Sequence, residues 1–240
     1  MNGFAGAQIA VTGASGGIGG AVCRWLTERG AHVYALDLRP EPGQVGTFIP
    51  IDVTDPDGVA AAAAEVLEHG GRIDGLVAAA GIAEDDVAAE EMDTATFDRV
   101  LSVNLRGVFL TCQSFGRPML AQGSGRIVAI SSMSGNHVVN EPQRQCAYNA
   151  SKAGVTALVK SLAVEWGPRG VRVNAVSPGY VDTPLNALKI HQHEQWKQRT
   201  VVPRFAETAE IAAAVGYLLS DEAAFCYGTE LLIDGGYSLR

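Results

Sequence analysis

Short apolar runs recur along the whole chain, and most of them are apolar throughout instead of alternating with polar residues. Such runs are typical of strands that are covered on both faces of a parallel sheet. They predict seven strands, at residues 8–12, 32–37, 47–51, 75–80, 126–131, 172–176 and 230–233.

Longer segments between these runs carry apolar residues at helical spacing. They predict helices at residues 18–29, 56–68, 94–118, 147–166 and 208–219. Regular alternation of strands and helices indicates a doubly wound α/β fold. We therefore expect one domain over residues 1–240, with a seven-stranded parallel sheet flanked by helices on both faces.

One stretch breaks this rhythm, at residues 181–205. It is polar and is bounded by Pro184 and Pro203. A connection of this length in a compact domain is more often a functional segment than a plain link. We expect it to act as a lid over a substrate site.

The composition suits a water-soluble domain with a large core, since 47% of the 240 residues are hydrophobic and 18% are charged. A formal net charge of −8 argues against nucleic acid as a main partner. No apolar run approaches the roughly 18 residues that a membrane span needs, and the N-terminus has no basic segment or cleavage site of a targeting signal. We expect a cytoplasmic protein that binds neither membrane nor nucleic acid.

The cysteines also favour a reducing compartment, because they are far apart and form no Cys-x-x-Cys motif. They are Cys23, Cys112, Cys146 and Cys226. His191 and His193 lie close together but lack the further ligands of a metal site, so no metal is expected.

A glycine-rich turn follows the first predicted strand, in the run Thr12-Gly13-Ala14-Ser15-Gly16-Gly17-Ile18-Gly19. Glycines between a strand and a helix let the backbone approach a pyrophosphate, and the helix N-terminus offers amides to the phosphates. We expect Gly13, Ser15, Gly17, Ile18 and Gly19 to bind a dinucleotide. An ordinary tight turn is the alternative.

Asp37 ends the second predicted strand, 18 residues after Gly19. A carboxylate there can accept hydrogen bonds from both hydroxyl groups of the adenosine ribose and repels a 2′-phosphate, which selects NAD over NADP. Gly16 adds no basic side chain, although Arg39 lies near enough in sequence to serve such a phosphate. The alternative for Asp37 is a solvated acid at a strand end.

Asp52 and Val53 follow the third predicted strand, where an adenine edge would be bound. The alternative for Asp52 is an acid that caps the helix beginning at Pro56.

Tyr148 and Lys152 are four residues apart, so on a helix they share one face. A cation beside a phenol favours the phenolate, and lowering a phenol pKa from about 10 to about 7 needs roughly 4 kcal/mol. One charge at about 4 Å supplies about that much at an effective dielectric near 20. The pair therefore indicates a general acid or base, with a chance pairing on an exposed helix as the alternative.

Together these residues resemble the short-chain dehydrogenase/reductase family, whose domain is a Rossmann fold. The motifs that carry the resemblance span nearly the whole chain in the family's order. They are Thr12–Gly19, Asn104 in Val103-Asn104-Leu105, Ser131-Ser132, Tyr148-x-x-x-Lys152, Pro178-Gly179 and Asp234-Gly235-Gly236.

The resemblance implies catalytic roles at four positions. Tyr148 would exchange a proton with the substrate oxygen, and Ser132 would polarise that oxygen. Lys152 would lower the phenol pKa and bind the nicotinamide ribose, and Asn104 would hold a water that relays protons. Asn104 as a buried structural residue, and Ser134 in place of Ser132, are the alternatives.

The resemblance also implies that Thr183 and the Val181 backbone orient the nicotinamide. The alternative for Thr183 is a residue that begins a turn before Pro184. After the fourth strand the family usually carries Asn-Asn-Ala-Gly, whereas this chain has Ala78-Ala79-Ala80-Gly81. The asparagine hydrogen bonds are thereby lost, but backbone contact of Ala79 and Gly81 with the adenosine ribose can survive.

The substrate class depends on the loop between Ser132 and Tyr148, which are 16 residues apart and farther than in many family members. The loop, residues 133–145, is rich in donors and acceptors and is similar to that of polyol and ketose dehydrogenases. We expect a NAD-dependent oxidoreductase that interconverts a small secondary alcohol and a ketone, and the family implies a homotetramer. The alternatives are a polar surface loop without a substrate role, a 3-oxoacyl carrier-protein reductase and a non-catalytic dinucleotide sensor.

Overall fold

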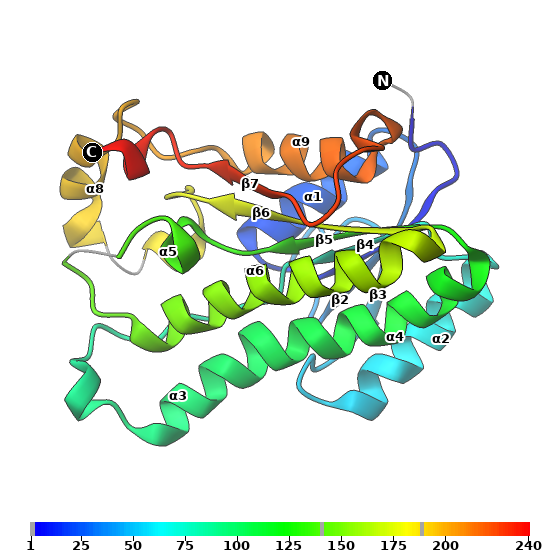
Figure 1. Cartoon of the computed structure of the whole chain (residues 1–240), viewed down its shortest axis with the longest axis horizontal. Helices are drawn as coiled ribbons and strands as arrows, with labels where there is room; N and C mark the ends of the chain where they lie inside the picture. Colours follow the sequence, from blue (N-terminus) through cyan, green and yellow to red (C-terminus); the bar gives the residue numbers. More distant parts are fainter. Residues whose placement is uncertain (1–2, 140–141, 188–189) are drawn as a thin grey trace.

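The computed structural model describes residues 3–139, 142–187 and 190–240. Within them the chain forms a seven-stranded parallel sheet in the order β3-β2-β1-β4-β5-β6-β7 (Figure 1). The strands are β1 (Gln8–Thr12), β2 (His32–Asp37), β3 (Thr47–Pro50), β4 (Gly75–Ala78), β5 (Gly125–Ile130), β6 (Val171–Pro178) and β7 (Glu230–Ile233). This sheet confirms the predicted α/β fold.

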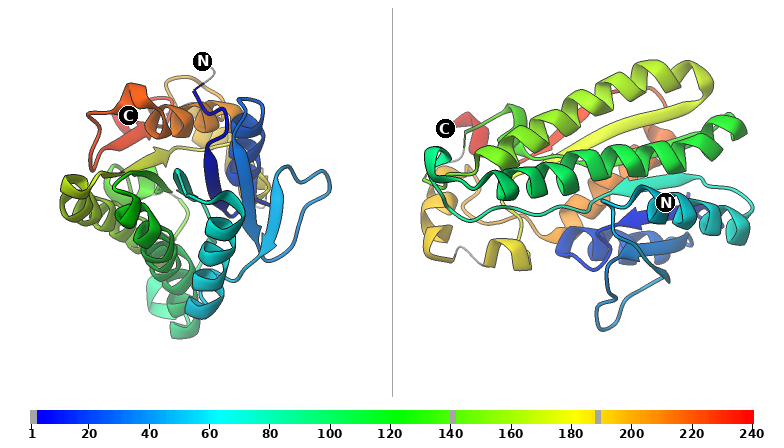
Figure 2. Two further views of the ribbon diagram at one scale, coloured as in Figure 1. Left: turned by 90° about the vertical axis from the view of Figure 1, so that its right-hand side faces the viewer. Right: turned by 90° about the horizontal axis from the view of Figure 1, so that it is seen from below.

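Helices cover both faces of the sheet (Figure 2). α1 (Gly17–Thr27) and α9 (Thr208–Leu219) pack against one face. α2 (Pro56–Gly70), α4 (Gly107–Gln122) and α6 (Cys146–Trp166) pack against the other. All five predicted helices are therefore present, with ends that differ by a few residues.

Side chains along β1 show why the strands read as continuous apolar runs. Ile9 and Val11 belong to the core beneath α1 and α9, whereas Ala10 belongs to the core beneath α2, α4 and α6. All three are at most 2% exposed. Successive side chains still point to opposite faces of the sheet. Because helices shield both faces from water, the side chains on both faces are apolar.

The helix predicted at residues 94–118 is a longer rod with a change of winding inside it. α3 (Thr94–Leu101) passes through a π-helical segment (Ser102–Arg106) into α4. The rod continues past Pro118 and ends where Gly123 adopts a left-handed conformation with φ of 70°. Such π segments often mark functional sites, and this one contains Asn104.

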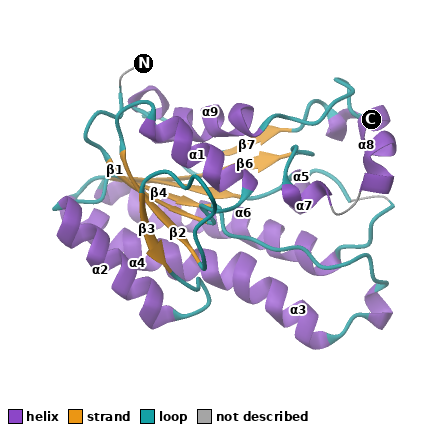
Figure 3. Cartoon of the chain, turned by 180° about the vertical axis from the view of Figure 1, so that it is seen from behind, coloured by secondary structure: helices purple, strands orange, loops and turns teal. Residues whose placement is uncertain are grey.

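The two polar segments contain short helices that the sequence pattern did not predict. They are α5 (Met133–Asn136), α7 (Pro184–Ala187) and α8 (His193–Arg199). All three lie at the end of the molecule toward which β6 and β7 point (Figure 3). Residues 140–141 of the substrate loop and 188–189 of the expected lid lie outside the described residues.

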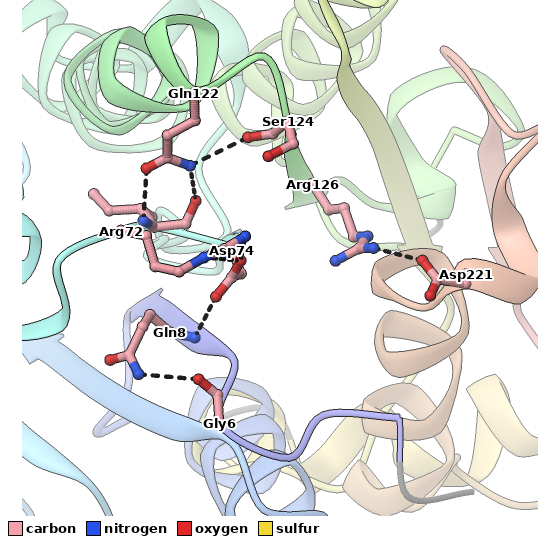
Figure 4. A network of polar contacts seen from close by, with 9 residues as sticks. Gly6, Gln8, Arg72, Asp74, Gln122, Ser124, Arg126 and Asp221 are labelled. Carbon is pink, nitrogen blue, oxygen red and sulfur yellow. Dashed lines mark hydrogen bonds and ion pairs between the residues drawn. The ribbon is translucent and has the colours of Figure 1, made fainter.

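The amino ends of the central strands are held by a polar network (Figure 4). The Asp74 carboxylate accepts from the Gln8 amide at 2.8 Å and from the Arg72 guanidinium at 2.7 Å. Gln122 bridges the amide and carbonyl of Ile73, each at 2.9 Å. These contacts fasten β1, β4 and α4 to one another at the amino edge of the sheet.

The sheet order reverses between β1 and β4, because the chain moves outward through β2 and β3 before it returns to β4. In open α/β sheets, the crevice at such a reversal lies beyond the carboxyl ends of the strands and is where ligands bind. The glycine-rich turn follows β1 and opens onto this crevice.

Candidate active site

The glycine-rich turn is built for close backbone approach. Gly13 has a φ of 68°, and a Cβ atom there would lie 2.6 Å from the Ala80 nitrogen. A Cβ atom at Gly19 would collide with the Gly13 carbonyl. Gly16 is the N-cap of α1 and provides no side-chain cap. The first turn of α1 therefore presents backbone amides and positive dipole to the crevice.

The start of the expected lid touches this turn. A Cβ atom at Gly17 would lie 2.7 Å from the Thr183 methyl carbon. Thr183 also begins α7, since its hydroxyl accepts from the Asn186 amide at 3.4 Å, as the turn alternative supposed. The Asn186 side chain donates to the Val181 carbonyl at 2.7 Å. Thr183 thus lies beside the glycine-rich turn, whereas the Val181 side chain is buried in the core beneath α1 and α9.

Asp37 lies against the same turn. One carboxylate oxygen accepts from the Ser15 amide at 3.0 Å, and the other accepts from the Leu38 amide at 2.7 Å. The Ser15 hydroxyl donates to the Arg39 carbonyl at 2.6 Å. Asp37 is therefore a partly buried, anchored acid at the carboxyl end of β2, rather than a freely solvated one.

Asp52 makes a local turn, and the alternative that it caps the next helix is wrong. Its carboxylate accepts from the amide and the hydroxyl of Thr54 at 2.8 and 2.7 Å. The cap of α2 is Asp55, whose side chain accepts from the Asp57 amide. Asp55 directly precedes a proline at the first helical position, and that is where a capping acid belongs. Val53 lies beside Gly107 of α4.

The residues Ala78 to Gly81 are braced without asparagines. The Thr12 hydroxyl accepts from the Ala79 amide at 3.2 Å and from the Ala80 amide at 3.4 Å. These bonds join the carboxyl ends of β1 and β4 and turn the backbone away, which is why β4 ends at Ala78 instead of residue 80. Ala79 lies next to Gly13 of the glycine-rich turn, whereas Gly81 lies beside the side chains of Asn104 and Lys152.

The Asn104 side chain is completely buried, and both its oxygen and its nitrogen are hydrogen bonded. Its Oδ1 accepts from the Ile82 amide, and its Nδ2 donates to the Ile82 carbonyl, both at 2.8 Å. Nδ2 also lies 3.1 Å from the Ser151 hydroxyl. These bonds fit the structural role given as the alternative for Asn104, and its Oδ1 atom keeps one lone pair that could accept from a water.

Ser132, Tyr148 and Lys152 come together at the carboxyl end of β5. Lys152 is 4% exposed, donates to the Ile130 carbonyl at 2.8 Å, and lies 5.7 Å from the centre of the Tyr148 ring. Ser131 points the other way, donating to the Lys152 carbonyl at 2.9 Å. Ser134 is buried, and its amide donates to the Ser132 hydroxyl at 3.2 Å.

The pKa of the Tyr148 phenol in this structure is shifted upward, whereas the sequence predicted that Lys152 would lower it. Burial raises the pKa of the Tyr148 phenol, although hydrogen bonding with Ser132 lowers that pKa and the Glu84 charge raises it further. Burial lowers the pKa of the Lys152 ammonium from 10.5 to about 8. Desolvation therefore outweighs attraction between the two groups in this structure.

A cavity of about 240 Å³ opens beside Tyr148 and Ser132. It is lined by the segment after β4, the loop before α6 and the segment after β6. Gln143 of the loop donates to the Tyr180 hydroxyl at 2.9 Å and accepts from the Trp196 indole at 3.0 Å. The Tyr180 and Trp196 rings stack with centres 4.1 Å apart. These contacts fasten the loop to α8.

Gln143, Gln192 and Trp196 of this cavity belong to the predicted substrate loop and lid, whereas Glu84 and Tyr180 were not predicted. Glu84 and Tyr180 come from distant segments, so no local spacing joins them. The expected lid segment supplies Leu185, Asn186 and His191 as well. His193 instead packs on Phe205 and bonds to the Asn186 carbonyl. Among the described residues, no group of three or more histidine, cysteine or acidic side chains could hold a metal ion.

Comparison with known proteins places this geometry among enzymes. A protein-family profile described as enoyl-(acyl carrier protein) reductase matches residues 13–238. The chain is 42% identical to galactitol 2-dehydrogenase (L-tagatose-forming) from Cereibacter sphaeroides, over 98% of this chain and 96% of that protein. It is 41% identical to cis-4-hydroxycyclohexanecarboxylate dehydrogenase from Sinomonas cyclohexanicum, over 98% of each.

The fold is also close to that of solved enzymes. The crystal structure of NADPH-dependent 3-quinuclidinone reductase from Rhodotorula rubra superposes with a TM-score of 0.93, at 33% sequence identity, over 100% of this chain and 94% of that one. In the described part of the protein, no helix is long and apolar enough to cross a membrane.

We expect the buried amine of Lys152 to destabilise the fold below about pH 8. The unfolded chain keeps its lysine proton up to a pKa of 10.5, whereas the folded protein releases it at about 8. Between these values the unfolded state binds more protons, so stability rises with pH across that window. The destabilisation is complete below about pH 8, absent above 10.5, and amounts to about 3 kcal/mol.

Urea unfolding of the native protein and the Lys152→Met variant measures this difference. The free energy of unfolding of the native protein, relative to the variant, should rise as the pH goes from 8 to 10.5. Lys160→Met is the matched control, because Lys160 is exposed on the same helix. For the control, the difference in unfolding free energy from the native protein should not change with pH. If the difference for Lys152→Met is also independent of pH, the buried ammonium is contradicted.

Proposed function

The chain belongs to the short-chain dehydrogenase/reductase family, and on that basis we propose that it is a NAD-dependent dehydrogenase of small polyols and the corresponding ketoses. It is an oxidoreductase that interconverts a secondary alcohol and a ketone with a nicotinamide dinucleotide. The observation that carries the proposal is the meeting of Ser132, Tyr148 and Lys152 at the edge of a polar cavity.

The crevice fits a dinucleotide. Side chains are absent where a pyrophosphate would approach, since Cβ atoms at Gly13 and Gly19 would meet backbone. The uncapped N-terminus of α1 would bind the phosphates. Asp37 would bind the adenosine ribose, and the backbone of Ala79 and Gly81 would lie along it. We assign the adenine to Asp52 and Val53, and the nicotinamide to Thr183 and Val181.

The bound nicotinamide would supply the acceptor or donor for a hydride. The protein's own residues would accept or donate the substrate's proton and would bind the substrate's reacting oxygen. Tyr148 would exchange the proton of the substrate hydroxyl, and Ser132 would donate a hydrogen bond to the developing oxygen charge. Lys152 would hold the nicotinamide ribose from below Tyr148. Asn104 would keep the chain at Ile82 in place beside them.

A polyol substrate is supported by the polar cavity next to Tyr148. Its lining includes Ser134, Gln143, Gln145 and Asn186, which offer donors and acceptors to hydroxyl groups. Galactitol 2-dehydrogenase, a relative at 42% identity, acts on such a compound. The family profile's description favours a second candidate, reduction of the carbon–carbon double bond of an enoyl thioester. A substrate panel of polyols, ketoses, enoyl thioesters and 3-oxoacyl thioesters, assayed with NAD(H), decides between them.

Removal of the Tyr148 hydroxyl should abolish turnover. We expect Tyr148→Phe to lower kcat for polyol oxidation by roughly 10³-fold, because the proton of the substrate loses its acceptor. The dissociation constant for NADH, measured by fluorescence, should change little, since the glycine-rich turn is untouched. Turnover of any substrate at the native rate would show that Tyr148 is not the acid or base. A native protein that binds NADH but oxidises nothing would favour the sensor alternative.

Asp37 should set the cofactor preference. We expect native kcat/KM to be higher with NAD than with NADP, and Asp37→Ala to reduce that ratio by roughly tenfold or more, because a charge that repels the 2′-phosphate is lost. Glu65→Gln is the control, since it removes the same charge from an exposed position on α2. A native preference for NADP would overturn the assignment and point to Arg39 as a phosphate ligand.

We infer a homotetramer, as the family implies. An apolar groove on α3, α4 and α6 supports this inference, with Leu101, Leu105, Phe109 and Leu158 on its walls. Phe109 is 40% exposed on this groove, and a contiguous apolar surface of this kind can mark an interface between subunits. Sedimentation equilibrium should give a mass four times that of the chain. A monomer at micromolar concentration would contradict the inference.

A further inference from the structure

Glu84 is a buried acid in the wall of the substrate cavity. It lies in the segment after β4 and is 3% exposed. Both oxygens of its carboxylate accept from the Tyr148 amide at 3.1 Å. Its carbonyl oxygen lies 3.4 Å from the Gln145 side-chain nitrogen, which donates to it. Neither the dinucleotide crevice nor the proton transfer assigned to Tyr148 uses this carboxylate.

The position of Glu84 at the N-terminus of α6 fixes its carboxyl group. The Tyr148 amide is the third of the helix, so the carboxylate acts as a cap supplied from another segment. One amide cannot satisfy a carboxylate, which can accept about four hydrogen bonds. The remaining acceptor capacity is available at the cavity.

Gln192 supplies a second observation on the opposite wall. Its side chain is 5% exposed and lines the same cavity. The Oε1 atom is buried and has no hydrogen-bond partner among the described residues. A buried carbonyl oxygen without a donor costs about 1–3 kcal/mol, and a ligand hydroxyl group would remove that cost.

The described wall of the cavity is acidic. Glu84, Asp85 and Asp86 all line it, and no lysine or arginine is among its described lining residues. Of the nearby cations, Arg144 bonds to Asp86 at 2.9 Å, and Lys152 lies 5.7 Å from the centre of the Tyr148 ring. A carboxylate or phosphate on the substrate would therefore meet a buried like charge at Glu84. Like charges that are brought together out of water repel strongly.

We propose that Glu84 and Gln192 form an acceptor subsite that binds the non-reacting hydroxyl groups of a neutral polyol and rejects anionic hydroxy acids. This inference rests on the proposed function, because it concerns the substrate of the same site. Hydroxyl groups are donors that satisfy both acceptors, whereas a carboxylate offers only acceptors. Discrimination of this kind is strong when the mismatched ligand leaves buried polar groups unpaired.

Glu84 is also a positioning residue for Tyr148. Its bond to the Tyr148 amide fixes the first turn of α6, and its charge raises the pKa of the phenol after the larger effects of burial and Ser132. Removing the charge should therefore shift the pH profile of oxidation toward lower pH. The other charged groups that face Tyr148 are Lys152 beneath it and the cavity groups Asp85, Asp86 and His191.

The test compares a sugar alcohol with the aldonic acid of the same carbon skeleton, such as galactitol and galactonate. Native kcat/KM should favour the alcohol. Glu84→Gln keeps the size of the side chain and an acceptor for the Tyr148 amide, and we expect it to reduce that ratio by roughly tenfold, mainly through KM. Glu90→Gln is the matched control, because Glu90 is exposed on the same segment and lies outside the cavity wall.

A second variant covers the case in which Glu84→Gln fails to fold. Gln192→Leu should raise KM for the alcohol by roughly tenfold and leave kcat within a few fold, since a hydroxyl partner is lost away from the reacting carbon. A ratio unchanged in Glu84→Gln, or a KM unchanged in Gln192→Leu, overturns the subsite. If no polyol is oxidised by the native enzyme, the proposed function itself has failed.

Discussion

Both faces of the sheet are covered by helices, and this constraint decides where chemistry can occur. A polar side chain inside either layer would be buried without water, so the strands carry apolar residues almost throughout. Polar groups gather at the two ends of the strands. Asn174, in the middle of β6, is buried but bonds to the Cys226 carbonyl and the Thr229 amide. The amino edge uses polar groups for fastening, as Asp74 and Gln122 do. The carboxyl edge, where the order reverses at β1 and β4, retains them for binding and reaction.

Helix α6 links the two halves of that edge. Its first turn is capped by Glu84 from the segment after β4, and its second turn places Lys152 against the Ile130 carbonyl of β5. Burial makes each of these charges costly, and the lowered pKa of the Lys152 ammonium shows that cost directly. A fold selected only for stability would place apolar residues here. The charges are retained because Tyr148 lies between them.

Sequence spacing predicted those features that are local. The strands followed from apolar runs, and Tyr148 and Lys152 followed from one helical turn. Features that depend on contacts between distant segments were not predictable. In the sequence, Glu84 is one of three consecutive acids and resembles a surface residue, but in the structure it is buried against the start of α6. Asp52 and Asp55 are equally good caps in sequence, and only the helix start at Pro56 separates them. The Asn104 side chain bonds to the Ile82 backbone and to the Ser151 hydroxyl, which spacing alone could not show.

The loop before α6 and the segment after β6 are polar in sequence, but buried side chains of the two segments bond to each other. Gln143 is 3% exposed and bonds to both Tyr180 and Trp196, whose rings stack. Thr183 of the same segment touches the glycine-rich turn at Gly17. One continuous set of contacts therefore joins the cofactor crevice to the substrate cavity. A dinucleotide bound against Gly17 would contact Thr183, and the bond between His193 and the Asn186 carbonyl connects that turn to the wall that carries Gln192. Coupling between the two sites through these contacts would act equally in both directions.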